Sequence, residues 1–308
     1  MEAIATLTDP SIPAVLPPTL QAFIPLLQAR KNDIESVTRK TFKYGSTDRH
    51  QLDVYYPPSS EKERAPVLFF EYGGGFNNGS RVQPSPADLL YPNIGAFFAK
   101  RGIYTVIADY RLVPEAKFPE AAEDVRDAVA WVVKNASDID KSHNVKLDVN
   151  NIFLLGNSAG AVHIVTAVLL EGLFPDDLRP HLRGLISLGG AFAFPVGGPA
   201  DGLLDVVRAY YGSDEQIKQN EPLALLGRAS EGIIKSLPDL LVLRSEKEPG
   251  FIASSNETML KELREKVSSK VDDDVLQGHN HISPSTSLSS GEGEEWGEKV
   301  ASWVKSKL

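Results

Sequence analysis

The sequence Asn151-Ile152-Phe153-Leu154-Leu155-Gly156-Asn157-Ser158-Ala159-Gly160 carries the strongest structural signal in this chain. Its first half is an apolar run typical of a buried strand, and a helix-like segment, 161–170, follows it. Between them lies a Gly-x-Ser-x-Gly pattern, in which the glycines leave room for a sharp turn on both sides of the serine. The stretch therefore predicts a nucleophile elbow, a strand–turn–helix unit that presents the Ser158 hydroxyl at its tip.

Strand-like and helix-like segments alternate around this elbow from Pro66 onward. Such alternation predicts an α/β fold with a mainly parallel central sheet and helices on both faces. The expected strands are 37–44, 51–56, 67–71, 104–109, 152–155, 185–188 and 240–244, and the expected helices are 20–29, 86–100, 119–135, 159–171, 254–267 and 292–307.

We interpret residues 1–308 as a single α/β domain with two additions. Residues 1–35 form a loop-and-helix lead-in that we expect to contribute to a cap. Residues 194–236 are rich in glycine, proline and charge and interrupt the alternation, so we expect a small lid insertion there. The alternative is a surface loop without function. The polar segment 283–293 is expected to be a loop.

Composition excludes several classes of function. The chain has no cysteine, so it has no disulfide, no thiolate metal site and no cysteine nucleophile. Its net charge is −9 without a long basic run, which argues against a nucleic-acid partner. The best candidate for a membrane span, 152–170, is interrupted by polar residues. A buried strand followed by a buried helix explains it better, and we expect no membrane span.

A serine nucleophile needs a histidine base, which in this topology follows the serine and the acid in the chain. Four histidines follow Ser158. His163 lies on the helix that leaves the elbow and is interpreted as a packed core residue, and His181 is interpreted as a surface residue. The candidates are therefore His279 and His281, in the segment before the last helix.

The same two histidines, with Asp272–Asp274 nearby, could instead form a metal site. No second cluster of ligand residues accompanies them, so the prediction includes no metal and no cofactor.

The acid that orients the base should follow the expected strand 240–244. Glu246 lies close to the end of this strand, and Glu248 precedes the turn Pro249-Gly250. A glutamate can orient an imidazole as an aspartate does. The residues alone leave both candidates open.

A glycine-rich loop follows the early strand 67–71, with the sequence Tyr72-Gly73-Gly74-Gly75-Phe76. Backbone amides in such a loop can approach a ligand closely. We expect the amides of Gly74, Gly75 and Ala159 to form an oxyanion hole. The loop contains neither a Walker A lysine nor a dinucleotide-binding pattern that would favour a phosphate site.

These motifs resemble the hormone-sensitive-lipase-like branch of the α/β-hydrolase superfamily, which includes arylacetamide-deacetylase-like and fungal carboxylesterases. The match covers roughly residues 50–308. The segments that carry it are Tyr72–Phe76, Asp109-Tyr110-Arg111-Leu112-Val113-Pro114-Glu115, Gly156–Gly160, Val242–Pro249 and Gly278-x-x-His281.

The resemblance implies a serine carboxylesterase of the α/β-hydrolase fold, and it favours Glu248 as the acid and His281 as the base. The sequence departs from the family pattern at three positions: Tyr72 replaces a histidine, and Asn157 and Glu248 replace aspartates. Tyr72, Phe76 and Asn157 are candidate substrate-pocket residues.

The expected activity is hydrolysis of small to medium apolar esters or lactones through an acyl-enzyme on Ser158. A thioesterase or amidase of the same mechanism is the near alternative, and a non-catalytic ligand-binding protein on the same fold is the distant one.

The last three residues, Ser306-Lys307-Leu308, form a peroxisome-import signal if the source is a eukaryote, and the partner would then be the import receptor. Otherwise the expected location is the cytoplasm. The same residues also fit the polar end of an amphipathic helix.

Overall fold

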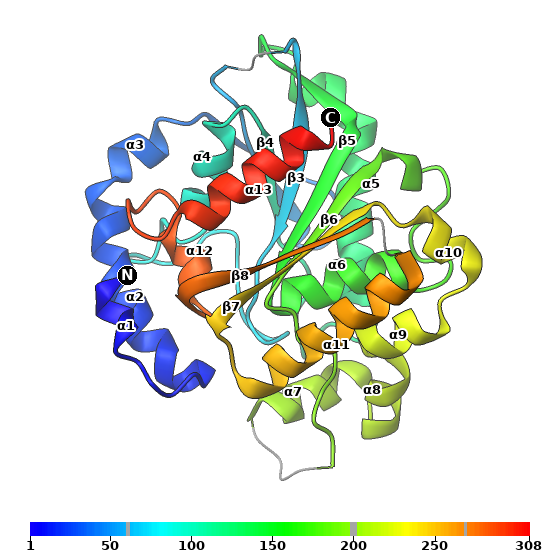
Figure 1. Cartoon of the computed structure of the whole chain (residues 1–308). Helices are drawn as coiled ribbons and strands as arrows, with labels where there is room; N and C mark the ends of the chain where they lie inside the picture. The colour runs from blue at the N-terminus through cyan, green and yellow to red at the C-terminus, as the bar shows by residue number, and fades with distance from the viewer. Residues whose placement is uncertain (60–61, 198–201, 268–269) are drawn as a thin grey trace.

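The computed structural model describes residues 1–59, 62–197, 202–267 and 270–308. Its central sheet has the strand order β1-β2-β4-β3-β5-β6-β7-β8 (Figure 1). The β1–β2 and β2–β4 pairs are antiparallel, and all other pairs are parallel. The strands are β1 Arg39–Lys43, β2 Gln51–Tyr55, β3 Arg64–Glu71, β4 Tyr104–Ala108, β5 Lys146–Asn157, β6 Leu182–Leu188, β7 Asp239–Lys247 and β8 Val271–Asn280.

Helices cover both faces of this sheet, as the alternation predicted. The mainly parallel sheet and its covering helices confirm the α/β fold class. The helices are α1 Glu2–Ala5, α2 Ile12–Ala29, α3 Lys31–Glu35, α4 Pro92–Ala99, α5 Glu120–Ile139, α6 Ala159–Leu169, α7 Gly202–Tyr211, α8 Asp214–Asn220, α9 Pro222–Arg228, α10 Glu231–Ser236, α11 Gly250–Val267, α12 Ser283–Ser287 and α13 Glu295–Ser306.

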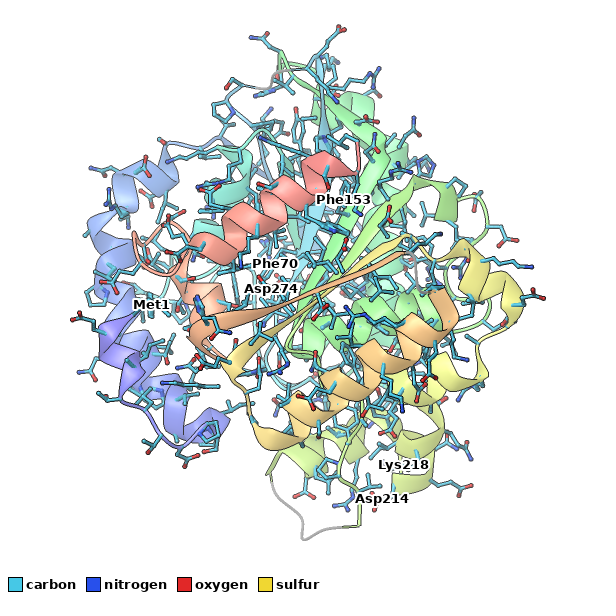
Figure 2. The ribbon with its side chains drawn as sticks, in the orientation of Figure 1. Met1, Phe70, Phe153, Asp214, Lys218 and Asp274 are labelled. Carbon is cyan, nitrogen blue, oxygen red and sulfur yellow. The ribbon has the colours of Figure 1, made fainter. Side chains whose placement is uncertain are left out.

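Side-chain alternation along the strands divides the core into two layers. Phe70 and Phe153 lie in the layer beneath α4 and α13 (Figure 2), whereas Phe69 and Leu154 lie in the layer beneath α5 and α6. All four side chains are fully buried. Strands covered on both faces are therefore apolar at nearly every position, which is why β3 and β5 were visible in the sequence.

The strand order changes direction at β3. The chain crosses from β3 to β4 on one side and then returns to β5 on the other side of β3. Glu71 at the end of β3 pairs with Gly156 near the end of β5. The two loops that follow these strands therefore start next to each other, at the kind of crevice where open α/β sheets bind ligands.

The N-terminal helix α2 is longer than the expected helix 20–29. It contains Pro17, Pro18 and Pro25, and it has no charged residue between Ile12 and Ala29. Val15, Thr19, Phe23 and Leu27 form its buried stripe. Within the described residues, α2 alone is long and apolar enough to cross a membrane by length and composition, a test that core helices and signal sequences also pass.

The described part of the segment between β6 and β7 contains helices α7 to α10. Helices α7 and α8 lie at the lower edge of the view in Figure 1, and Asp214 and Lys218 mark this outer end in Figure 2. The described part of 194–236, where we expected a lid insertion, contains these four helices. Residues 198–201 of the expected lid lie outside the described residues.

Two further elements differ from the expectation. The acidic segment that we considered near a metal pair forms the edge strand β8, which pairs with β7. The segment expected as a polar loop, 283–293, begins with the buried helix α12. Polar residues in both elements bond to partners within the protein, so neither element was visible from hydrophobicity.

Candidate active site

The turn between β5 and α6 has the conformation of a nucleophile elbow. Ser158 has φ 54° and ψ −119°, a backbone conformation that residues other than glycine rarely adopt. A Cβ atom at Gly160 would lie 2.0 Å from the Glu71 carbonyl oxygen, and one at Gly156 would lie 2.6 Å from Ala161. Glycine is therefore required on both sides of the serine, and the half-buried hydroxyl remains accessible.

His281 lies within hydrogen-bonding distance of this serine. Its Nε2 is 2.9 Å from Ser158 Oγ, although the two residues are 123 positions apart in the chain. His281 follows β8 directly and its side chain is only 3% exposed. An imidazole at this distance can accept the serine proton.

Glu248 completes the relay from the end of β7. Its Oε2 is 2.6 Å from His281 Nδ1, and its Oε1 accepts a hydrogen bond of 3.1 Å from the Ser245 amide. Burial alone would raise the pKa of Glu248, but the charge and hydrogen bond of His281, together with the Ser245 amide, hold it below its usual value. The carboxylate is therefore ionised at neutral pH and can fix the orientation of the ring.

A glycine that the sequence analysis did not single out makes room for this pair. Gly189, just after β6, has φ 56°, and a Cβ there would lie 2.7 Å from Glu248 Oε1 and 3.3 Å from His281 Nδ1. The Gly189-Gly190 doublet at the end of an expected strand was the available signal.

The alternative candidates lie elsewhere. The Glu246 carboxylate accepts a hydrogen bond of 2.7 Å from the Gly278 amide. His279 Nδ1 is 2.9 Å from Ser283 Oγ, and burial lowers the pKa of His279 to about 4. Neither side chain contacts Ser158 in the described structure.

The glycine loop after β3 lies beside the nucleophile. A Cβ at Gly73 would be 2.9 Å from Ser158 Cβ, which shows how closely the backbone approaches. Gly74 and Gly75 have φ 139° and 59°. Within the described residues, the amides of Gly74, Gly75 and Ala159 donate to no protein acceptor. These three donors are available to an oxyanion.

Tyr72 supports this loop from below. Its side chain is fully buried, its hydroxyl donates to Asp109 Oδ1 at 2.7 Å, and the same hydroxyl accepts from Arg49 at 2.8 Å. Arg49 also donates to the Gly79 carbonyl at 3.0 Å, and a Cβ at Gly79 would lie 2.6 Å from the Tyr72 ring. The Tyr72 ring is thus enclosed by the loop. It can influence the reaction centre by holding the backbone of the loop in place, and it does not contact Ser158 directly.

The other two pocket candidates also support the turn. Asn157 Nδ2 donates to the Leu188 carbonyl at 3.3 Å, and Asn157 Oδ1 accepts from Ser285 of α12 at 3.1 Å. Phe76 is 3% exposed and its ring packs against His163 and Tyr210. Contact of Tyr72, Phe76 or Asn157 with a substrate stays a prediction.

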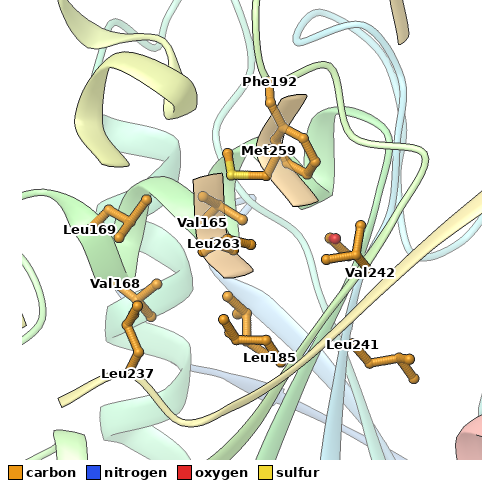
Figure 3. Close-up of a pocket in the computed structure, with 12 residues that line it drawn as sticks. Val165, Val168, Leu169, Leu185, Phe192, Leu237, Leu241, Val242, Met259 and Leu263 are labelled. Atoms are coloured by element: carbon orange, nitrogen blue, oxygen red, sulfur yellow. The ribbon is translucent and has the colours of Figure 1, made fainter. Parts of the chain in front are cut away.

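The described residues contain no group of three or more His, Cys, Asp or Glu side chains that could hold a metal ion. A cavity of about 20 Å³, whose lining includes none of Ser158, Glu248 and His281, is drawn in Figure 3. Its lining is apolar apart from Ser187 and comes from α6, β6, β7, α11 and nearby segments, including Val165, Phe192, Val242 and Met259. A void of this size holds at most about one water molecule and is a packing defect.

Comparison with known proteins agrees with this geometry. The BD-FAE family model matches residues 52–177, less than half of the chain. A probable isoprenylcysteine alpha-carbonyl methylesterase of Arabidopsis thaliana is 32% identical over 152 residues, which cover 49% of this chain and 32% of that protein. A probable carboxylesterase of a Phoma species is 29% identical over 161 residues, 50% of this chain and 47% of that protein. The chain thus spans a third to a half of the length of these relatives.

Solved structures match nearly the whole chain. Esterase Est22 has a TM-score of 0.70 at 18% identity, covering 92% of this chain and 86% of that one. Carboxyl esterase 2 of the fungus Tuber melanosporum has a TM-score of 0.66 at 18% identity, covering 92% and 99%. The fold is that of the α/β-hydrolases. The two relatives named above are esterases, and the predicted resemblance to α/β-hydrolase esterases is confirmed.

Proposed function

We propose that this chain is a carboxylic ester hydrolase that works through an acyl-enzyme on Ser158. The observation that carries the proposal is the relay Glu248–His281–Ser158, with separations of 2.6 Å and 2.9 Å. Two observations support it further: the three available amides beside the serine, and the names of the relatives, which are carboxylesterases and methylesterases.

In the first half of the proposed reaction, Ser158 Oγ bonds to the ester carbonyl carbon while His281 Nε2 takes its proton. The carbonyl oxygen becomes an oxyanion, and the amides of Gly74, Gly75 and Ala159 donate to it. Each such donor is worth about 3 kcal/mol in the transition state. Collapse of this intermediate breaks the bond to the alcohol oxygen, which leaves with the proton from Nε2.

In the second half, a water molecule gives a proton to His281 Nε2 as its oxygen attacks the acyl carbon. Collapse then breaks the bond to Ser158 Oγ, which recovers the proton, and the carboxylic acid is released. Glu248 stays ionised throughout and stabilises the imidazolium that forms in each half.

The proposed substrates are small to medium, fairly apolar esters or lactones. The buried ring of Phe76 follows the proposed oxyanion loop, and the apolar side chain of Leu203 lies 3.7 Å from the Cβ position of Gly75. These neighbours favour an apolar acyl group. The helices α7 to α10 and the lead-in 1–35 are proposed as the lid and the cap, respectively. Thioesters and amides would react by the same steps and remain as alternatives to be measured.

The test is hydrolysis of p-nitrophenyl acetate and butyrate by the wild type, Ser158→Ala and the control Ser187→Ala. Ser187 is a buried serine on β6 that pairs with Gly156, outside the relay. We expect turnover in the wild type and the control and none above background in Ser158→Ala. Equal turnover in all three proteins would overturn the proposal, and absence of turnover in all three would favour a ligand-binding protein.

We also propose that Ser306-Lys307-Leu308 directs this protein to peroxisomes where Leu308 ends the chain in a eukaryotic cell. The exposure of Leu308, at 42%, supports recognition by an import receptor. Lys307 forms ion pairs with Asp239 and Asp272, and these must be released for the tail to extend. Deletion of the three residues from a tagged copy should abolish import. Unchanged import would refute the assignment.

A further inference from the structure

Asn280, the residue before His281, stabilises the turn that contains His281 by hydrogen bonds. Asn280 Oδ1 accepts hydrogen bonds from the amides of Ile282 at 2.9 Å and Ser283 at 3.0 Å, on the far side of His281. The backbone amide of Asn280 in turn donates a hydrogen bond to Ser283 Oγ at 3.1 Å. The backbone on both sides of His281 is therefore fixed by one asparagine.

The remaining polar group of Asn280 bonds to a helix from the opposite end of the sequence. Its Nδ2 donates to Thr19 Oγ1 of α2 at 2.9 Å, across 261 positions of the chain. Thr19 and Asn280 are 0% and 1% exposed. Solvent does not reach this bond, so loss of the threonine hydroxyl leaves a buried side-chain amide donor of Asn280 without a partner, which is unfavourable.

Helix α2 thereby contacts the catalytic turn directly. Thr19 lies on the buried stripe of α2, which packs on α12, the helix that begins two residues after His281. Without the Thr19 hydroxyl, the side-chain amide of Asn280 can regain a partner for Nδ2 only if the side chain rotates. That rotation breaks the bonds from Oδ1 to the backbone amides of Ile282 and Ser283. The resulting displacement of the imidazole matters because misplacement of a reacting group by about 1 Å can cost up to about 10²-fold in rate.

We propose that Thr19 and Asn280 are positioning residues for His281, and that α2 is thus a functional part of the reaction centre. The proposal rests on the proposed function, because its kinetic consequence requires His281 to be the base. Neither residue contacts the reacting atoms. The effect therefore falls on kcat, whereas KM changes little.

The central variant is Thr19→Val, which keeps the shape of the side chain and removes the hydrogen-bond acceptor. We expect kcat for p-nitrophenyl butyrate to fall about 10-fold, with KM within about twofold of the wild type. Thr19→Ser keeps the hydroxyl and should restore most of the rate. The matched control is Thr166→Val, because Thr166 is 1% exposed and its hydroxyl has no partner within the described residues. The control should retain wild-type kcat.

A second readout does not depend on turnover. Hydrogen exchange of the amides in 278–288 should be faster in Thr19→Val than in the wild type, and unchanged in Thr166→Val. Asn280→Ala removes the bond to Thr19 together with the acceptor of the Ile282 and Ser283 amides, so it should increase exchange at least as much. Adding Thr19→Val to it should have no further effect on kcat, because the bond between Thr19 and Asn280 is already absent.

The outcomes separate the two proposals. Wild-type turnover equal to that of Ser158→Ala would refute the proposed function, and the positioning role would fall with it. Ser158-dependent turnover with normal kcat and normal exchange in Thr19→Val would overturn the positioning role alone. A fall in kcat that Thr19→Ser does not restore would also overturn it, because the hydroxyl would then not be the cause.

Discussion

His281 and His163 are both almost completely buried, with exposures of 3% and 1%, yet their surroundings differ in one decisive way. Both ring nitrogens of His281 have a partner, Glu248 on one side and Ser158 on the other. Neither nitrogen of His163 has a partner within the described residues, and burial lowers the pKa of His163 to about 3.

His163 is only five residues from the nucleophile, whereas His281 is 123 away. The rings of Phe76, Tyr110 and Tyr210 surround His163, with centroids 5.3, 4.8 and 5.6 Å away. Proximity in sequence and burial therefore do not make a base. A base also requires one partner that fixes the ring and one that supplies the proton.

The largest expected effect follows from exchanging each histidine for an apolar residue. His281→Ala should lower kcat/KM by about 10⁴-fold or more, because the serine loses its base. His163→Leu should stay within about threefold of the wild type, since its nitrogens have no role in the relay. The measurement is kcat/KM for p-nitrophenyl butyrate with both proteins. Comparable losses in the two variants would remove the distinction between the two sites.

The second effect concerns the two glutamates at the end of β7. Glu248→Ala should lower kcat by about 10³-fold, because the imidazolium loses its orienting carboxylate. Glu246→Ala should change kcat less than about threefold, since the one hydrogen bond of the Glu246 carboxylate among the described residues is to the Gly278 amide. Steady-state kinetics at neutral pH with both variants decides the assignment, and the opposite order would transfer the role to Glu246.

A smaller effect on kcat is expected from a change at Tyr72, which packs against the glycine-rich loop after β3. Tyr72→Phe keeps the stacked ring but leaves Arg49 and Asp109 without the hydroxyl between them. We expect kcat to fall about 10-fold with little change in KM, because the oxyanion amides are then less well fixed. The control is Tyr104→Phe, which removes a buried hydroxyl bonded to Val145 in the other core layer. A rate loss of equal size in Tyr104→Phe would mean that the effect is general destabilisation.

The smallest effect is on stability and concerns His163. Its pKa is about 3 in the folded state and about 6.5 in the unfolded state, so below pH 6.5 the unfolded chain binds the proton and the folded protein does not. Stability is therefore lost as the pH falls through this window. For His163 alone the loss between pH 6.5 and pH 5 is about 2 kcal/mol.

His163→Leu should remove this contribution. Urea unfolding at several pH values should show that the unfolding free energy of the variant rises relative to that of the wild type as the pH falls from 6.5 to 5. A difference in unfolding free energy that does not depend on pH would contradict the low pKa of this buried ring.

Much of the fold was predictable because its central strands are covered on both faces. The runs 67–70, 152–155 and 185–188, within β3, β5 and β6, are apolar at nearly every position. Glycine is required on both sides of Ser158 because a Cβ atom there would clash with neighbouring backbone. Such signals are local, so they survive without any knowledge of the partners. The positions of Gly74 and Gly75 beside Ser158 follow from the pairing of β3 with β5.

The elements that were missed depend on distant partners. Strand β8 has three aspartates after Val271, and each of them forms an ion pair with a side chain outside the strand. The partners of Asp272, Asp273 and Asp274 are Lys307, Arg264 and Lys299, respectively. Helix α12 is buried although it consists of Ser, Pro and Thr, because its polar atoms bond within the protein. The buried position of Tyr72 likewise depends on Arg49 and Asp109. No local pattern in the sequence contains this information.

The most direct test of Ser158 as the nucleophile is a crystal structure of the protein after reaction with an alkyl phosphonate ester. We expect a covalent bond between phosphorus and Ser158 Oγ. The phosphonyl oxygen should lie within hydrogen-bonding distance of the backbone amides of Gly74, Gly75 and Ala159. A phosphonate bound to another residue, or one whose oxygen points away from these amides, would contradict it.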